Sequence, residues 1–160
     1  MSTRTGTGYD SHRLDAGRPL ILGGVRIPDA ARGLTGHSDA DVLTHAVIDA
    51  LLGAAGLGDI GHHFPDTDDR FKDADSLALL AETRNLLSGA SLKPVHVDAT
   101  VIAEAPKLGP YRDAMAEALA GALGVAATAV NVKFTTNEGM GFLGRGEGMA
   151  AMAVANLEAA

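Results

Sequence analysis

The sequence contains no cysteine and no tryptophan, and aromatic residues of all kinds make up only 4% of its 160 residues. Without cysteine there can be no disulfide bond, no thiolate ligand for a metal and no thiol catalysis. Any metal ion bound by side chains would need histidine and carboxylate ligands. Because hydrophobic residues still make up 46% of the chain, the core is expected to consist of small aliphatic side chains.

The sequence also lacks a basic run and a long apolar segment. Its formal net charge of -7 argues against nucleic acid and against an anionic membrane surface as partners. No stretch is long enough to span a bilayer, and the first residues carry no hydrophobic signal segment. With no internal repeat and no linker, residues 1–160 are expected to form a single cytoplasmic domain.

Strand and helix patterns are mixed along the chain. Strands are predicted at 3–9, 20–27 (interrupted by a Gly-Gly turn), 95–103, 130–136 and 148–157, the last with helical ambiguity because it is rich in alanine. Helices are predicted from a Ser38 or Asp39 cap to about residue 54, over 75–88, and from Pro110 to 124, with an irregular loop over 59–72. This order favours an α+β domain in which three helices cover one face of a mixed sheet.

Three side chains have the composition of a metal site. Asp10 and His12 are two residues apart, so on a strand both point to one face, and His45 lies on the first turns of the predicted helix. Two imidazoles and one carboxylate leave one position open on a divalent cation, as catalytic rather than structural zinc sites do. Individually, such residues are more often surface groups or hydrogen-bonded core groups than metal ligands.

The helix that carries His45 has a polar stripe of Asp41, His45 and Asp49, with Ile48 and Leu52 on the same side. We expect this face to be covered by loops of the same fold or by another subunit. Asp41 and Asp49 are candidates for fixing the tautomer of His45. Either could instead be structural or contact a substrate.

Two glycine-rich segments could bind a ligand. In the first, Asp59, Asp66 and Asp68 could accept hydrogen bonds from a polyol, although aspartate and glycine are also common in turns for backbone reasons alone. His62 and His63 are expected on the surface or packed in this loop. In the second, two threonines and Glu138 precede several glycines, which suits phosphate and Mg²⁺, or else a hairpin without function.

Several motifs occur together in order: Gly8-Tyr9-Asp10-Ser11-His12, Leu22-Gly23-Gly24-Val25, His37-Ser38-Asp39-Ala40-Asp41, Leu57 to Asp68, Ala105-Pro106-Lys107, Thr135-Thr136-Asn137-Glu138, and Gly141-Phe142 through Gly148. With these motifs the chain resembles the 2-C-methyl-D-erythritol 2,4-cyclodiphosphate synthases of the non-mevalonate isoprenoid pathway. The resemblance covers roughly residues 4–157. It departs at Leu108-Gly109-Pro110-Tyr111, which bears on the cytosine pocket, and at Asn137, where threonine is common.

The resemblance implies roles for individual residues. Asp10, His12 and His45 would bind Zn²⁺ or another divalent cation, and Glu138 would hold Mg²⁺ or Mn²⁺ together with the substrate phosphates. His37 and Thr136 would act on the reacting phosphates. The substrate-binding residues would be Ser38, Asp59, Ile60, Gly61, Phe64, Pro65, Asp66, Thr67, Asp68, Ala103, Lys107, Thr135, Phe142 and Arg145.

The resemblance also implies a homotrimer with active sites between subunits, and a lyase that cyclises a cytidine diphosphate substrate with release of CMP. Two other classes stay open. A zinc-dependent phosphohydrolase would use the same metal site but yield a linear product. A non-catalytic trimer would bind an isoprenoid diphosphate near Phe142, Arg145 and Glu147 without turnover.

Overall fold

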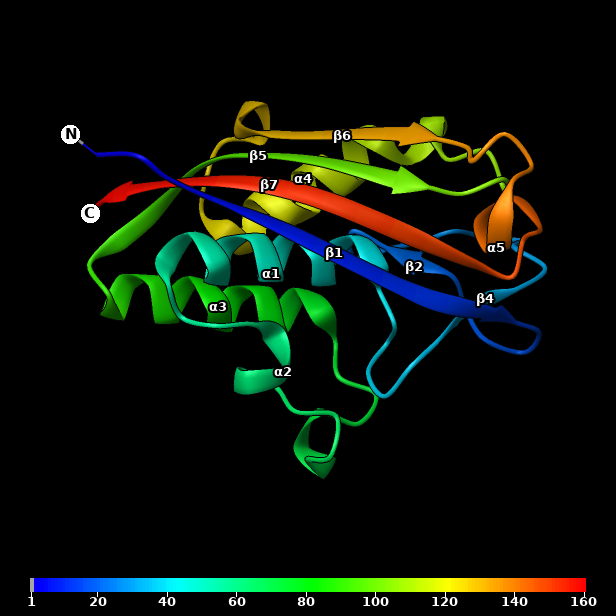
Figure 1. Ribbon diagram of the computed structural model, residues 1–160, viewed down its shortest axis with the longest axis horizontal. Helices are drawn as coiled ribbons and strands as arrows, with labels where there is room; N and C mark the ends of the chain where they lie inside the picture. Colours follow the sequence, from blue (N-terminus) through cyan, green and yellow to red (C-terminus); the bar gives the residue numbers. More distant parts are fainter. Residues whose placement is uncertain (1) are drawn as a thin grey trace.

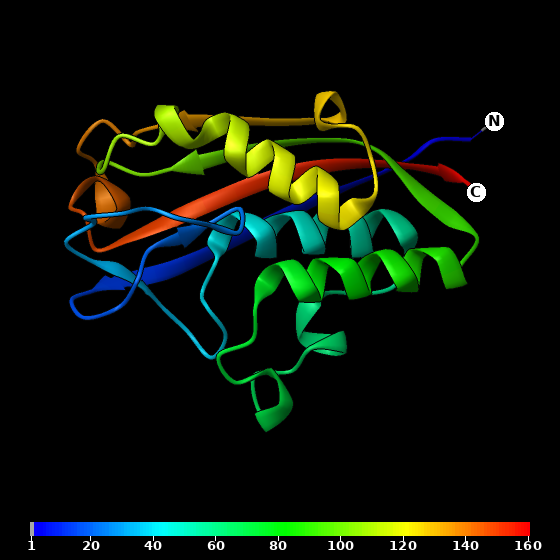
Figure 2. The same ribbon diagram turned by 180° about the vertical axis from the view of Figure 1, so that it is seen from behind.

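The computed structural model describes residues 2–160, which form one five-stranded mixed sheet with helices packed on one face (Figures 1 and 2). The strand order is β4-β1-β7-β5-β6, and every neighbouring pair is antiparallel except β5 and β6. The strands are β1 (Arg4–Asp15), β4 (Gly33–Thr35), β5 (Leu92–Ile102), β6 (Val130–Thr135) and β7 (Gly148–Ala159). The predicted α+β class and mixed sheet are confirmed.

Five α-helices occur in the described residues, so the prediction of three helices was too low. The three long ones are α1 (Val42–Ala55), α3 (Ser76–Gly89) and α4 (Arg112–Leu123), and the two short ones are α2 (Ile60–His63) and α5 (Gly141–Gly144). Three single 3₁₀ turns are η1 (Asp69–Phe71), η2 (Gly109–Tyr111) and η3 (Ala127–Ala129). Each short helix spans about one turn, and a hydrophobic periodicity cannot be recognised in so short a segment.

Two predicted helix starts were wrong. Helix α1 begins at Val42 and its cap is Asp41, whose carboxylate accepts a hydrogen bond from the Thr44 N–H, so neither Ser38 nor Asp39 caps it. Pro110 lies in the 3₁₀ turn η2, and α4 begins two residues later. The predicted Gly-Gly turn joins the two-stranded hairpin of β2 (Ile21–Leu22) and β3 (Val25–Arg26).

The core lies between α1 and the central strands β1 and β7. Helix α1 sits directly on two glycines of β1, because a Cβ atom at Gly8 would overlap the carbonyl oxygen of Ala46 and one at Gly6 would overlap that of Ala50. Ile48 and Leu52, on the His45 side of α1, are fully buried. Since α3 packs along α1 (Figure 2), the molecule's own fold covers that face.

The other face of the sheet carries exposed apolar side chains. Tyr9 and Met152 are each 53% exposed and stand opposite one another on β1 and β7, and Val154 is 40% exposed. All three long helices lie on the opposite face (Figures 1 and 2). No helix within residues 2–160 combines the length and the hydropathy that a membrane span requires.

Candidate functional site

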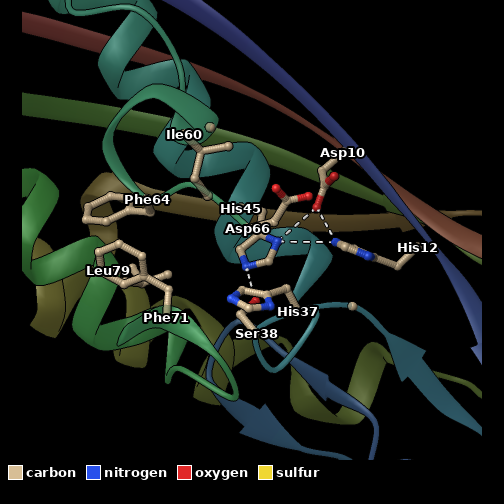
Figure 3. Close-up of a pocket in the computed structure, with 12 residues that line it drawn as sticks. Asp10, His12, His37, Ser38, His45, Ile60, Phe64, Asp66, Phe71 and Leu79 are labelled. Carbon is tan, nitrogen blue, oxygen red and sulfur yellow. Dashed lines mark hydrogen bonds and ion pairs between the residues drawn. The ribbon is translucent and has the colours of Figure 1, made fainter. Parts of the chain in front are cut away.

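Asp10, His12 and His45 converge at one end of the pocket shown in Figure 3. The Oδ2 atom of Asp10 lies 2.8 Å from His12 Nε2 and 3.0 Å from His45 Nδ1, and the two ring nitrogens are 3.3 Å apart. The strand period brings Asp10 and His12 to one face of β1, and the packing of α1 on Gly8 brings His45 against them.

A cation fits the chemistry of these three groups. His12 Nδ1 lies 3.0 Å from the carbonyl oxygen of Thr35, which can only accept, so Nδ1 carries a proton and Nε2 is the ring atom that a cation would bind. Tetrahedral zinc with bonds of about 2.1 Å places its ligand atoms roughly 3.4 Å apart. The three atoms lie 2.8 to 3.3 Å apart, slightly closer than that, and this group could hold a metal ion.

The cluster changes the ionisation of its members. Burial raises the pKa of Asp10, but hydrogen bonds with His12 and His45 and the charges of those rings outweigh it and lower the pKa to about 2. Burial lowers the pKa of His12, but the hydrogen bond to Asp10 and the charge of that carboxylate outweigh it and raise the pKa. Asp10 is therefore an ionised carboxylate at neutral pH, as a metal ligand must be.

The carboxylates of Asp41 and Asp49 do not hydrogen-bond to the His45 ring. Asp41 accepts from the N–H groups of Gly23, Gly24 and Thr44 and from the Thr44 hydroxyl, and burial raises its pKa. Asp49 accepts from the Ile60 N–H at 2.8 Å. Asp41 thus joins the β2–β3 turn to α1 and Asp49 holds α2, so the hypothesis that they fix the His45 tautomer was wrong. Two serine hydroxyls, of Ser38 and Ser76, face His45 Nε2 instead.

A pocket of about 390 Å³ extends from the metal cluster. Of the predicted substrate loop, Ile60, Gly61, Phe64 and Asp66 line it, together with His37 and Ser38 (Figure 3). Phe71 and Leu79 add an apolar wall that the sequence analysis missed, because nothing in the local sequence says that η1 and α3 fold back over this loop.

The rest of the predicted loop has other contacts. The Asp59 carboxylate caps α2 by accepting from the His62 N–H, and the Asp68 carboxylate pairs with Arg70, which lowers the pKa of Asp68. The Asp68 carbonyl is the partner of His37 Nε2 at 3.0 Å, so this loop is held against His37. Pro65 is half-buried and Thr67 is exposed, and neither lines the pocket. His63 Nε2 donates to the Leu57 carbonyl and His62 is exposed, as expected for packing and surface roles.

A second cavity, of about 460 Å³, lies at the ends of β5 and β6. It is lined by the predicted residues Ala103, Lys107, Thr135 and Thr136. Glu104, which the sequence analysis did not single out, accepts hydrogen bonds from the N–H groups of Asn137 and Gly139. Glu104 therefore fixes the turn in which Glu138 is exposed with a φ of 53°.

Phe142 and Arg145 lie apart from both cavities. Phe142 is 44% exposed on α5 and borders a hollow with Ser11, Arg13 and Glu147. Arg145 pairs with Glu147 at 2.9 Å.

The two halves of the predicted site are separated across the sheet. Ser11, Ala150, Ile102 and Thr135 occupy one row on β1, β7, β5 and β6. Three interstrand steps amount to about 14 Å. Within one chain, the metal cluster and Thr136 therefore do not face a common point.

Comparison with known proteins places these features in context. The model of the YgbB family matches residues 3–158. A protein of Desulfosudis oleivorans named 2-C-methyl-D-erythritol 2,4-cyclodiphosphate synthase is 63% identical over 152 residues, which cover 95% of this chain and 90% of that protein.

Solved structures have the same fold. A 2C-methyl-D-erythritol-2,4-cyclodiphosphate synthase in a CDP-bound form superposes with a TM-score of 0.88 at 39% identity, covering 97% of this chain and all of that one. The bifunctional IspDF of Campylobacter jejuni gives a TM-score of 0.95 at 43% identity, and there the match covers 99% of this chain but 43% of the longer protein.

Proposed function

The chain belongs to the YgbB family, and from this premise we propose that it converts 4-diphosphocytidyl-2-C-methyl-D-erythritol 2-phosphate into 2-C-methyl-D-erythritol 2,4-cyclodiphosphate and CMP in isoprenoid biosynthesis. The observation that carries the proposal is the Asp10, His12 and His45 group at the end of a pocket, in a chain matched along its length by synthases. Residues 1–160 then form one synthase domain.

The reaction is an intramolecular phosphoryl transfer. An oxygen of the 2-phosphate attacks the β-phosphorus, the bond from that phosphorus to the oxygen bridging to the α-phosphate breaks, and CMP leaves with the electron pair. No water and no protein nucleophile take part. The protein's contribution is to hold the substrate in a folded conformation, which can supply about 7–11 kcal/mol in favourable systems, and to balance the phosphate charges.

Each site residue has a separate proposed role in this reaction. Asp10, His12 and His45 would hold Zn²⁺ or another divalent cation, and Glu138 would hold Mg²⁺ or Mn²⁺ with the α- and β-phosphates; these cations supply positive charge against the phosphate oxygens. His37 and Ser38 would contact phosphate beside the first cation, and Thr136 would steady the phosphoryl group that moves.

Each cavity suits one end of the substrate. The 390 Å³ pocket, with Asp66 and the turn at Ile60 and Gly61, would take the methylerythritol unit. The 460 Å³ cavity, with Lys107 and Thr135, would take the cytidine end. A synthase of the same fold was solved in a CDP-bound form, which supports a cytidine nucleotide as a ligand.

We further propose a homotrimer whose active sites lie between chains. Residues of both halves would have to reach one substrate molecule, yet β1, which carries Asp10 and His12, and the end of β6, next to Thr136, are about 14 Å apart within a chain. A neighbouring chain that supplies the second half would resolve this separation. The exposed apolar face around Tyr9, Met152 and Val154 offers a surface for that contact.

A mixing experiment tests the shared site. His45→Ala and Thr136→Ala chains, each inactive alone, should regain activity when they are unfolded together and refolded into mixed assemblies. Sedimentation should give three times the 16.3 kDa mass of one chain. A fully active monomer, or mixed assemblies without activity, would contradict the shared site.

The reaction itself is tested by phosphorus NMR with the substrate, Zn²⁺ and Mg²⁺. We expect CMP to appear together with a cyclic diphosphate. A linear product would instead identify the protein as a phosphohydrolase, and ligand binding without turnover would identify it as a binding protein.

Glu138→Gln is predicted to weaken the binding of the second cation and to leave the binding of zinc unchanged. A neutral amide is a poor ligand for a hard divalent cation, so the Mg²⁺ concentration for half-maximal activity should rise by on the order of 10- to 100-fold or more, with zinc content unchanged. Titration of activity with Mg²⁺ measures this shift. Glu117→Gln, at an exposed site on α4, is the matched control, and an unshifted Mg²⁺ curve for Glu138→Gln would remove Glu138 from the site.

A further inference from the structure

The imidazole of His45 is held at both of its nitrogens. Nδ1 faces Asp10 and His12, while Nε2 lies 2.8 Å from the Ser76 hydroxyl and 3.1 Å from the Ser38 hydroxyl. Ser76 is fully buried and His45 is 7% exposed, so water does not compete for these contacts. With a cation on Nδ1, the ring proton would lie on Nε2 and be donated to one of these hydroxyl groups.

The Ser76 hydroxyl has only one proton to donate, and it donates that proton in a hydrogen bond to Asp39. Ser76 Oγ donates to Asp39 Oδ1 in a short hydrogen bond, and the Ser76 N–H donates to Asp39 Oδ2 at 2.9 Å. A carboxylate oxygen is the acceptor here, so the Ser76 hydroxyl is the donor of the first bond. The oxygen of Ser76 is then left to accept from His45, which requires a proton on Nε2.

We propose that Asp39 and Ser76 are positioning residues that keep the His45 proton on Nε2, so that the Nδ1 lone pair points at the cation. The inference rests on the proposed metal-assisted function and deepens it. Asp39 acts only through Ser76, because its own oxygen is 4.0 Å from His45 Nε2. Hydrogen-bonded partners of this kind typically raise metal affinity by about 10- to 100-fold.

The same contacts join three parts of the site. Asp39 lies in the loop with His37 and Ser38, and Ser76 is the first residue of α3. Two backbone bonds hold these segments together, from the Asp39 N–H to the Ala74 carbonyl and from the Asp73 N–H to the His37 carbonyl. The start of α3 is thereby fixed to the loop that leads into α1, the helix that carries His45.

A purely structural role predicts a different outcome, and a neighbouring residue provides the control. Asp75 caps the same helix by accepting from the Leu77 N–H at 3.0 Å, but it is exposed and does not touch His45. If Asp39 and Ser76 merely anchored α3, Ser76→Ala, Asp39→Asn and Asp75→Ala would all alter stability and leave His45 unchanged.

The experiment has two readouts on the purified full chain. Proton–nitrogen correlation NMR of the zinc-loaded protein observes the His45 Nε2–H proton, assigned through couplings within that ring. In the unaltered protein and in Asp75→Ala we expect this proton to lie downfield and to be protected from exchange with water by its hydrogen bond to Ser76. In Ser76→Ala and Asp39→Asn we expect it to move upfield and to exchange faster.

Zinc competition against a chromophoric chelator is the second readout. Ser76→Ala and Asp39→Asn should bind Zn²⁺ about 10- to 100-fold more weakly than the unaltered protein, and Asp75→Ala should change affinity less than about threefold. A His45 Nε2–H proton that exchanges freely in the unaltered protein, or unchanged exchange and zinc affinity in Ser76→Ala, would overturn the proposal. Absence of zinc binding by the unaltered protein would instead overturn the proposed metal function.

Discussion

Replacing His45 with alanine should remove the bound metal and nearly all turnover. The change deletes one of the three proposed ligands and leaves Asp10 and His12, whose atoms are 2.8 Å apart, as a two-ligand site. Because the proposed cation would supply several kcal/mol of charge stabilisation to a reaction between phosphates, we expect turnover to fall by on the order of 10³-fold or more. Metal content by mass spectrometry and CMP release measure the two effects.

His62→Ala is the matched control for this prediction. His62 is exposed on α2 and its ring does not line the pocket, so metal content and turnover should stay close to those of the unaltered protein. Full metal occupancy in His45→Ala would show that His45 is not a ligand of the metal.

Replacing Gly8 with alanine should destabilise the protein and disrupt the metal cluster together. The new Cβ would overlap the Ala46 carbonyl oxygen and lie 2.8 Å from the Ala50 nitrogen, both backbone atoms of α1. The helix would have to move by roughly 1 Å, and forced overpacking of this kind costs about 1–3 kcal/mol or more. Since Asp10 is on β1 and His45 on α1, the same shift separates two of the ligands.

Urea unfolding and zinc titration check the two parts of this prediction. Gly121→Ala on α4 is the control, because a Cβ there meets no other atom; alanine in a helix interior should stabilise it by up to about 1 kcal/mol. If Gly8→Ala unfolds at the same urea concentration as the unaltered protein, the close packing of α1 on β1 is not what places His45.

Part of this site could be read from the sequence because it depends on local periodicity. A two-residue spacing on a strand brings Asp10 and His12 to one face, and a helix start soon after the His37 loop supplies His45. Ser76 and Asp39 could not be found in this way, because they are 37 residues apart in the chain and meet only when α3 packs against α1.

The fold likewise depends partly on local patterns and partly on distant contacts. The sequence of strand β7 was ambiguous because alanine favours helices, and this segment is a strand because it pairs with both β1 and β5. Strand β4 was not predicted, since three residues give too short a pattern. The Asp41 cap was missed because its carboxylate is fixed by the distant Gly23-Gly24 turn as well as by α1.

The pairing of β1 with β7 has a consequence for how the chain folds. These strands, the first and last elements of the chain, run side by side from the Arg4–Leu157 pair to the Arg13–Gly148 pair. During synthesis β1 has no β7 to pair with until almost the whole chain has been made. Contacts of such long sequence separation make folding slow. Until then Asp10 and His12 lie on a strand that lacks its central neighbour, so we expect the cation to join late, after the sheet has closed around β7.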